Sequence, residues 1–389
     1  MSLGGALKNC MSSSPGVRDL LISTIVLIGL MALGSWLAPV DPVCMNAKWF
    51  GNDWPYRQKF LLNAWPDGNP EYSMDLQDFT IPVQISSEER AFWGNVKPDG
   101  ADVRFVDCNG SLMSYEIEEF DYGAKRMLAW VKLPKLGTSA PVKCFFVYYG
   151  NSIATPTAFS DVWQSNYRYV FHMNAPKVNM LDSTNEKYRA SITNYSDITN
   201  TEQGMFGRSI KLNGKSALSI EYGHDINFGK DDWSIELWAR LPVSNENRKN
   251  KNILSLGADS SFNLYLHSDG FLVLELANNN VTAEISFGDA KLVPGKWTYL
   301  VIQRNGGMID MWADDHYSAK QLKPANFAIS GQHNNLLFGA GRFGYTEIAL
   351  DEVRISQGIA RSSSWIRATQ LAASGKLGAL NSVERQIIP

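Results

Sequence analysis

The chain has 389 residues, of which 44% are hydrophobic and 19% charged, and its net charge is −3. This length allows two or three domains with sizeable buried cores. No basic stripe stands out in the sequence, which argues against nucleic acid as a partner.

An apolar segment without charged residues lies near the N-terminus, at residues 20–38. A helix of about 19 residues is just long enough to cross a hydrocarbon core of roughly 30 Å. Lys8 and Arg18 precede this segment, and the first basic residue after it is Lys48. The positive-inside rule therefore predicts a transmembrane helix with residues 1–19 in the cytoplasm.

A cleaved signal peptide is the alternative interpretation of the same segment. Cleavage after Ala38 is disfavoured by Trp36 and Pro39, whereas cleavage after Gly34 is chemically acceptable. Both interpretations place the rest of the chain outside the cytoplasm. We expect a single-pass protein of the cytoplasmic (inner) membrane whose following domains lie in the periplasm or outside the cell.

Residues 39–53 form a turn-rich linker, and from residue 54 the pattern changes to short β-rich runs separated by turn signals. This pattern predicts a β-sandwich domain at 54–151. Its expected strands are 56–62, 79–85, 101–106, 113–117, 126–133 and 142–149.

Several motifs of this block occur in a recognisable order, among them WPYRQKF at 54–60, GADVRFVD at 100–107 and VYYGN at 147–151. The block resembles an envelope domain of unknown function from bacteria and archaea, which opens with Trp-x-Tyr-Arg and ends with Tyr-Tyr-Gly-Asn. The resemblance implies a neighbouring laminin-G-like domain. It also implies an association with proton-channel proteins of the ExbB/TolQ/MotA type, which some family members have.

A linker at 152–160 leads into a second all-β block at 161–375, followed by a C-terminal tail at 376–389. The expected strands are 233–241, 262–267, 271–277, 281–287, 297–303, 308–313 and 348–355, and a helix is expected at 362–373. In strand 233–241, apolar residues alternate with a second set that includes Glu236 and Trp238, so the two sets face opposite sides of a sheet.

The second block resembles a concanavalin A-like, laminin-G-like jelly roll, on the evidence of DDWSIELWARL at 231–241, VPGKWTYLVIQRNGGMIDMWAD at 293–314 and IALDEVRIS at 348–356. The predicted fold class is therefore all-β, with two β-sandwich (jelly-roll-like) domains after a single N-terminal transmembrane helix.

The second resemblance implies a calcium site, because many laminin-G-like domains bind one calcium ion near a turn after their first strand. Asp182 in that turn and Asp351 in the closing strand are the matching residues, and calcium prefers such oxygen ligands. Glu186, Lys187 and Tyr188 replace the glycines of the family's turn. This departure leaves open that Asp182 caps a turn and that Asp351 accepts backbone hydrogen bonds.

Jelly-roll domains of this type bind glycans or proteins through aromatic rings and amide groups. Trp238, Tyr265, Trp312 and Asn279 are the ligand-binding residues that we predict. The alternative for the aromatic residues is a place in the core.

Two cysteines of the first block, Cys108 and Cys144, can form a disulfide in an oxidising compartment, and two buried thiols are the alternative. Glu116 and Glu118 share one face of a strand, as the acid and base of a glycoside hydrolase would. The histidines are isolated and no nucleophile elbow is present, so we predict no catalytic residues and no enzyme activity.

The sequence thus favours a membrane-anchored recognition or scaffold protein that binds a glycan or surface protein through its laminin-G-like domain. An accessory subunit of an ExbB/TolQ/MotA-type channel is the alternative function, and a glycoside hydrolase comes third.

Overall fold

The computed structural model describes residues 47–63, 75–137, 143–159, 161–174, 180–184, 188–193, 201–220, 228–243, 249–256, 261–278, 281–323, 328 and 335–386. The membrane helix predicted at 20–38 and the candidate Asn279 lie outside these residues. Neither helix of the described part is long and apolar enough for a membrane crossing.

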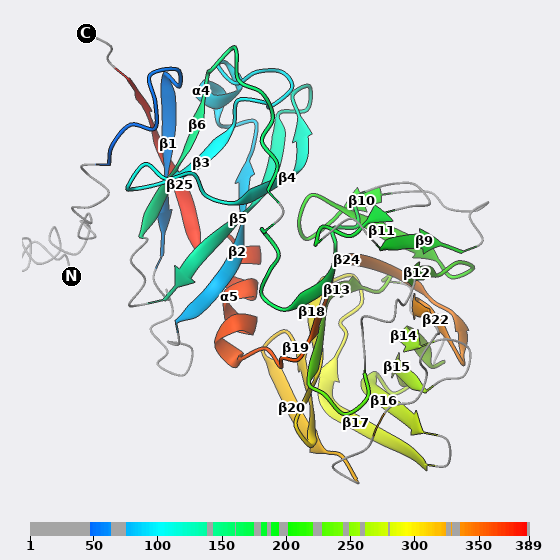
Figure 1. Ribbon diagram of the computed structural model, residues 1–389. Helices are drawn as coiled ribbons and strands as arrows, with labels where there is room; N and C mark the ends of the chain where they lie inside the picture. Colours follow the sequence, from blue (N-terminus) through cyan, green and yellow to red (C-terminus); the bar gives the residue numbers. More distant parts are fainter. Residues whose placement is uncertain are drawn as a thin grey trace, which may run out of the picture. The chain divides into compact units, whose positions relative to one another are not determined.

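The first module consists of two small antiparallel sheets whose apolar side chains share one core (Figure 1). One sheet has the order β25-β1-β6-β3, formed by β1 (Tyr56–Leu62), β3 (Arg104–Asp107), β6 (Cys144–Tyr149) and β25 (Gly378–Arg385). The other has the order β2-β5-β4, formed by β2 (Leu76–Ile85), β4 (Tyr115–Asp121) and β5 (Arg126–Leu136). A short helix, α4 (Arg90–Trp93), follows β2. The six strands predicted for this block are confirmed, with shifted ends.

Strand β25 belongs to the first module although it follows the whole second module in the sequence. It pairs with β1 in antiparallel register from Tyr56 opposite Arg385 to Leu62 opposite Gly378, and Figure 1 shows red β25 beside blue β1. Arg57 also forms an ion pair of 2.7 Å with Glu384. The segment predicted as a C-terminal tail at 376–389 therefore contains an edge strand of the first module. Backbone pairing with β1 holds this strand, and its Leu380 and Val383 pack against the core of the first module.

The second module contains two large antiparallel sheets with an apolar core between them. The first sheet has the order β10-β11-β24-β13-β18-β19-β20, and β7 also pairs with β24; its strands are β7 (Tyr167–Phe171), β10 (Thr201–Gln203), β11 (Arg208–Asn213), β13 (Trp233–Arg240), β18 (Thr298–Asn305), β19 (Met308–Ala313), β20 (His316–Gln321) and β24 (Glu347–Gln357).

The second sheet of this module has the order β17-β16-β15-β14-β21-β12-β9-β8. Its strands are β8 (Met180–Leu181), β9 (Arg189–Ile192), β12 (Leu218–Ile220), β14 (Lys251–Leu256), β15 (Phe262–Leu266), β16 (Phe271–Asn278), β17 (Val281–Lys291) and β21 (Leu336–Phe338). A small hairpin of β22 (Ala340–Gly341) and β23 (Gly344–Tyr345) lies in the same module. The predicted sandwich is thus confirmed, and its shortest strands were not predicted.

Strand β13 shows how the two modules meet. Its alternation is as predicted, because Ile235 and Leu237 enter the core of the second module. However, the opposite face is also covered: Trp238 is only 6% exposed and belongs to the same apolar cluster as the core of the first module. The sheet of β13 therefore has buried side chains on both faces.

Helix α5 (Ser363–Ala373) fills the space between the modules, close to the predicted 362–373. Ser362 caps its N-terminus by accepting a hydrogen bond from the Trp365 backbone N–H at 3.2 Å. Trp365 packs edge-on against Phe79 of β2, with ring centroids 4.9 Å apart. The helix thus connects the second module with the sheet that carries β4 and β5.

Candidate functional site

A pocket of about 590 Å³ lies where the two modules meet. The first module, the connector and the residues after β7 all contribute to its walls. Its lining includes Asp99, Arg104, Tyr115, Glu116, Glu118, Phe120, Thr157, Phe159, His172, Asn174, Asp182 and Ser183. Charged and hydroxyl groups therefore share this pocket with aromatic rings.

Strand β4 supplies two of the carboxylates that line the pocket, Glu116 and Glu118. The pairing of β4 with β5 shifts between Ile117 and Glu119, so Glu118 lies at a β-bulge. The indole N–H of Trp130 on β5 donates a hydrogen bond of 2.7 Å to Glu118 Oε2. This bond fixes the Glu118 side chain, which has no exposed surface.

Glu116 lies nearer to the opening of the pocket, with 29% of its side chain exposed. Its Oε2 accepts a hydrogen bond of 2.6 Å from the Trp163 indole, and its Oε1 accepts one of 2.8 Å from the Ser183 hydroxyl. Trp163 and Ser183 lie outside the first module's strands, so this carboxylate connects the two blocks of sequence.

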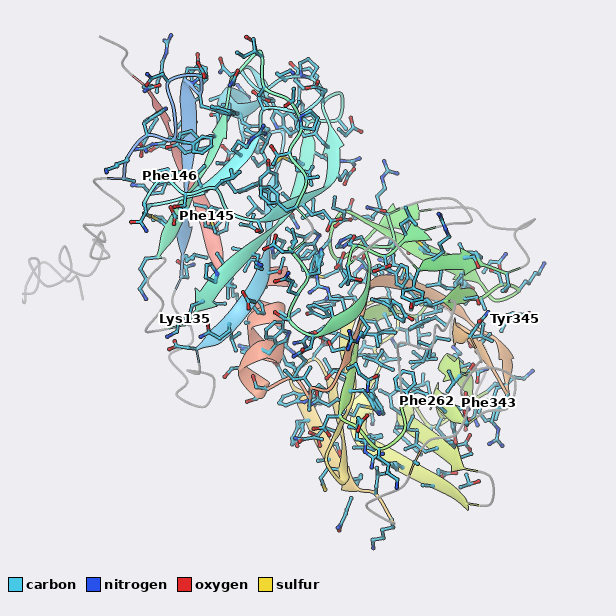
Figure 2. The ribbon with its side chains drawn as sticks, viewed as in Figure 1. Lys135, Phe145, Phe146, Phe262, Phe343 and Tyr345 are labelled. Carbon is cyan, nitrogen blue, oxygen red and sulfur yellow. The ribbon has the colours of Figure 1, made fainter. Side chains whose placement is uncertain are left out.

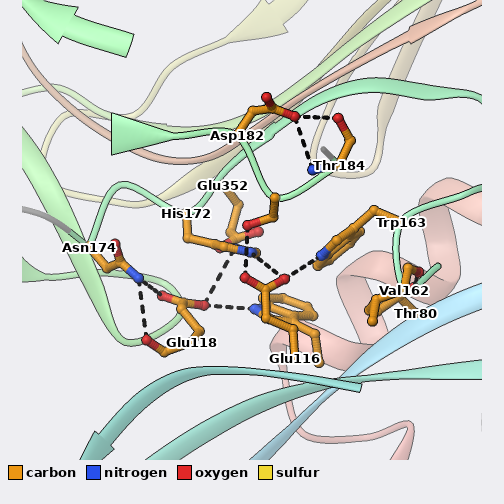
Figure 3. Close-up of polar contacts among 12 residues, drawn as sticks. Thr80, Glu116, Glu118, Val162, Trp163, His172, Asn174, Asp182, Thr184 and Glu352 are labelled. Atoms are coloured by element: carbon orange, nitrogen blue, oxygen red, sulfur yellow. Dashed lines mark hydrogen bonds and ion pairs between the residues drawn. The ribbon is translucent and has the colours of Figure 1, made fainter. Parts of the chain in front are cut away.

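His172, directly after β7, is the centre of the carboxylate cluster (Figure 3). Its Nδ1 lies 2.7 Å from Glu352 Oε1 and 3.5 Å from Glu118 Oε2, whereas its Nε2 lies 3.4 Å from Glu116 Oε2. The imidazole stacks on the Trp130 ring, with centroids 5.6 Å apart and an interplanar angle of 15°.

Glu352 reaches this cluster because β24 is irregular at that point. The register of β24 against β13 shifts where Glu236 pairs with Arg354 and Trp238 with Asp351, and Glu352 has a φ of 48°. Bulges of this kind redirect a side chain. Arg354 donates hydrogen bonds of 3.1 and 2.7 Å to Glu352 Oε2, which leaves Oε1 facing His172.

The buried charges shift one another's pKa values. Burial raises the pKa of Glu118 to about 8, and the nearby Glu352 carboxylate adds to this rise. Burial also disfavours the charged forms of Glu116 and Glu352, but the attraction of His172 outweighs it and lowers both pKa values. For His172, burial is outweighed by the three carboxylates, which raise its pKa well above 6.5.

The carboxylates predicted to bind calcium accept backbone hydrogen bonds. Asp182 accepts from the backbone N–H groups of Thr184 (3.0 Å) and Tyr188 (2.9 Å), and from the Thr184 hydroxyl. Asp351 is fully buried and accepts from the N–H groups of Phe206 and Glu352, both at 2.9 Å. These bonds are the alternative roles that the sequence left open. Calcium binding by the two residues stays a prediction.

The aromatic residues predicted to bind a ligand are largely covered. Trp238 packs on Tyr299 with ring centroids 5.0 Å apart, which is the place in the core that the sequence left open for the aromatic residues. Tyr265 is 5% exposed and packs against Phe343, which is labelled in Figure 2. Trp312 is half-buried and packs against Tyr317, with ring centroids 4.5 Å apart and the ring planes tilted by 39°. None of the three lines the junction pocket.

The two cysteines are close together: Cys108 Sγ lies 2.7 Å from Cys144 Sγ. The structure therefore places both sulfurs within reach of one another, as the predicted disulfide requires. Their oxidation state stays a prediction.

Sequence reasoning missed His172, Glu352 and Arg354 as members of the site. His172 has no metal-binding or catalytic spacing to another histidine, so no local pattern marks it. The pair Asp351-Glu352 within an otherwise apolar strand was the available signal, since two adjacent carboxylates cannot both face the solvent side of a strand.

The fold and the junction define a two-module, all-β protein with a lectin-like second module. Residues 99–169 match the model "Domain of unknown function (DUF2341)", and residues 212–367 match the concanavalin A-like lectin/glucanases superfamily. The chain thus carries this domain of unknown function followed by a concanavalin A-like domain, as its motifs predicted. The opening Trp-x-Tyr-Arg lies before the matched residues, and the link to channel proteins stays a prediction.

Solved structures with a similar fold include the binding domain of Paraclostridial Mosquitocidal Protein 1, at 17% identity and a TM-score of 0.44, covering 52% of this chain and 51% of that chain. The binding domain of Botulinum neurotoxin DC, solved in complex with rat synaptotagmin II, has 14% identity and a TM-score of 0.40, covering 53% and 52%. The chain spans about half the length of these structures. No curated protein matches the chain.

Proposed function

We propose that this is a recognition protein that binds a carbohydrate in the pocket between its two modules. The observation that carries the proposal is the composition of the pocket wall, in which carboxylates and hydroxyls occur together with aromatic rings. A volume of about 590 Å³ also suits a small ligand or one to two sugar units.

The polar groups of the pocket fit the hydroxyls of a sugar. Glu116 is partly exposed and is held by Trp163 and Ser183, so its carboxylate is fixed before any ligand arrives. Asn174 lines the same pocket and adds an amide. A preorganised acceptor loses little conformational entropy when it binds a hydroxyl.

The apolar groups of the pocket fit the C–H face of a sugar ring. Phe120 and Phe159 line the pocket and are only partly buried. Aromatic rings offer a large apolar surface at a small entropic cost. By contrast, Trp238, Tyr265 and Trp312, the aromatic residues predicted from sequence, do not line this pocket.

Glycoside hydrolysis is less favoured by this geometry. A general acid has to touch the glycosidic oxygen, and the Glu118 side chain has no exposed surface. Anchoring through residues 20–38, an extracytoplasmic location and a channel partner rest on the sequence alone and stay predictions.

The test is a glycan-array screen with the full-length chain in mild detergent, followed by calorimetric titration of the glycans that bind. Glu116→Gln keeps the shape of the side chain but removes its charge. We expect a roughly ten- to hundredfold loss of affinity, because hydrogen bonds to charged groups contribute about 1.5–3 kcal/mol.

Glu119→Gln is the matched control, because Glu119 lies on the same strand, pairs with Arg126 and does not line the pocket. It should bind as the unaltered chain does. Equal binding by the Glu116 variant, or the absence of any bound glycan, would contradict the proposal.

A further inference from the structure

Three side chains from separate elements converge beneath the pocket. Glu118 comes from β4, His172 follows β7 and Glu352 comes from β24, and one possible ligand atom of each lies within 4.8 Å of the others. Both Glu118 and His172 are among the residues that line the pocket.

The distances within this group suit a common cation. His172 Nδ1 lies 2.7 Å from Glu352 Oε1 and 3.5 Å from Glu118 Oε2. Ligand atoms on a tetrahedral zinc ion lie about 3.3 Å apart, since each is about 2.0–2.1 Å from the metal. The separation of His172 Nδ1 from Glu118 Oε2 is close to this value, whereas Nδ1 and Glu352 Oε1 have to move apart by about 0.6 Å around an ion.

A single proton on His172 Nδ1 cannot form good hydrogen bonds with both neighbouring carboxylates. Nδ1 of an imidazolium carries one proton, but two carboxylate oxygens face that nitrogen. The shorter distance assigns the proton to Glu352. Glu118 then keeps only its contacts with Trp130 and Asn174. A cation at the position of the proton would satisfy both carboxylates.

Each of the three residues also contacts a further side chain that does not belong to the group of three. Glu116 Oε2 faces the other imidazole nitrogen, Nε2, at 3.4 Å. Trp130 holds Glu118, and Arg354 holds Oε2 of Glu352 and leaves Oε1 toward the histidine. Metal-bound histidines commonly donate their second N–H to a carboxylate in this manner.

We propose that Glu118, His172 and Glu352 form a binding site for a divalent transition-metal ion. One imidazole and two carboxylates form a mixed nitrogen and oxygen set, which suits zinc and manganese better than calcium. This site is distinct from the calcium site predicted at Asp182 and Asp351. It does not depend on the identity of the pocket's ligand.

The experiment uses the full-length chain in mild detergent, stripped with a chelator and then dialysed against zinc, manganese or calcium. We expect about one zinc ion per chain by elemental analysis, a raised melting temperature with zinc and little change with calcium. A chromophoric chelator in competition gives the affinity. Glu118→Gln and His172→Gln should each weaken zinc binding at least tenfold, and Glu119→Gln should not.

A chain that retains no zinc overturns the proposal, as does a Glu118 or His172 variant that binds zinc like the unaltered chain. If these variants do not fold, zinc binding by the unaltered chain still tests the proposal.

Discussion

The two modules differ in where the residues of their cores come from. The core of the second module lies between its own two sheets and uses residues between Tyr169 and Ile355. The core of the first module continues into Trp238 and Tyr299 of the second module, and into Leu371 and Leu377 after it. The second module thus supplies its own core, whereas the first is completed by later parts of the chain.

This difference explains why the junction holds a functional site. Side chains from both modules and from the connector are fixed there by a shared apolar cluster, so carboxylates far apart in sequence can be held around one imidazole. A rigid frame of this kind is what a preorganised binding site requires.

Removal of the chain after residue 375 is the strongest test of whether the first module depends on later parts of the chain for its core. It deletes β25 and Leu377, which is 3% exposed. Truncating one such leucine to alanine costs about 2–5 kcal/mol, and the truncation also unpairs one edge of β1. We expect the first module to unfold at a lower temperature while the second stays folded, as measured by calorimetry and limited proteolysis.

Deletion of residues 387–389 alone is the control, and it should leave both transitions in place. A chain truncated at 375 that melts like the full-length chain would show that the first module closes its own core.

Disruption of a buried ion pair behind the junction should have the next largest effect. Arg361 Nε donates to Glu236 Oε1 at 3.0 Å, and both side chains are 1% exposed. Glu236→Ala leaves the guanidinium buried without this partner and should destabilise the protein by about 3–5 kcal/mol in urea unfolding.

A double-mutant cycle with Arg361→Met sharpens this test. The second substitution removes the stranded charge, so the double variant should be more stable than Glu236→Ala alone. Simple additivity of the two losses would contradict the ion-pair interpretation.

The smallest expected effect is a pH dependence specific to the junction, measured in metal-free buffer. His172 and Glu118 have raised pKa values, so the stability that they contribute is lost as the pH rises. This loss begins at pH 6.5 for His172, and for Glu118 it runs from pH 4.5 to about pH 8. Glu116 and Glu352 have lowered pKa values, so their contribution is lost as pH falls below 4.5. We therefore expect the free energy of unfolding to be greatest between pH 4.5 and pH 6.5.

His172→Gln should flatten the alkaline side of this profile, since each unit of pKa shift corresponds to about 1.4 kcal/mol. His267→Gln is the control, because His267 lies in a hairpin of the second module near Asp269. An unchanged alkaline decline in the His172 variant would exclude His172 as its cause.

Much of the fold follows from local sequence. Short β-rich runs between turn residues predicted the six strands of the first module, and the helical spacing at 362–373 predicted α5. The motifs around 231–241 and 348–356 predicted the lectin-like sandwich. Short strands such as β8 and β22 were missed because two residues carry no periodic pattern.

The sequence alone determined the class of the two modules, their order and the two faces of strands such as β13, because alternation along a strand is a local property. Only the tertiary structure decided that the polar face of β13 is covered, that β25 returns to β1, and that His172 is surrounded by Glu116, Glu118 and Glu352. These features depend on contacts between residues far apart in the chain, which no local pattern of residues encodes.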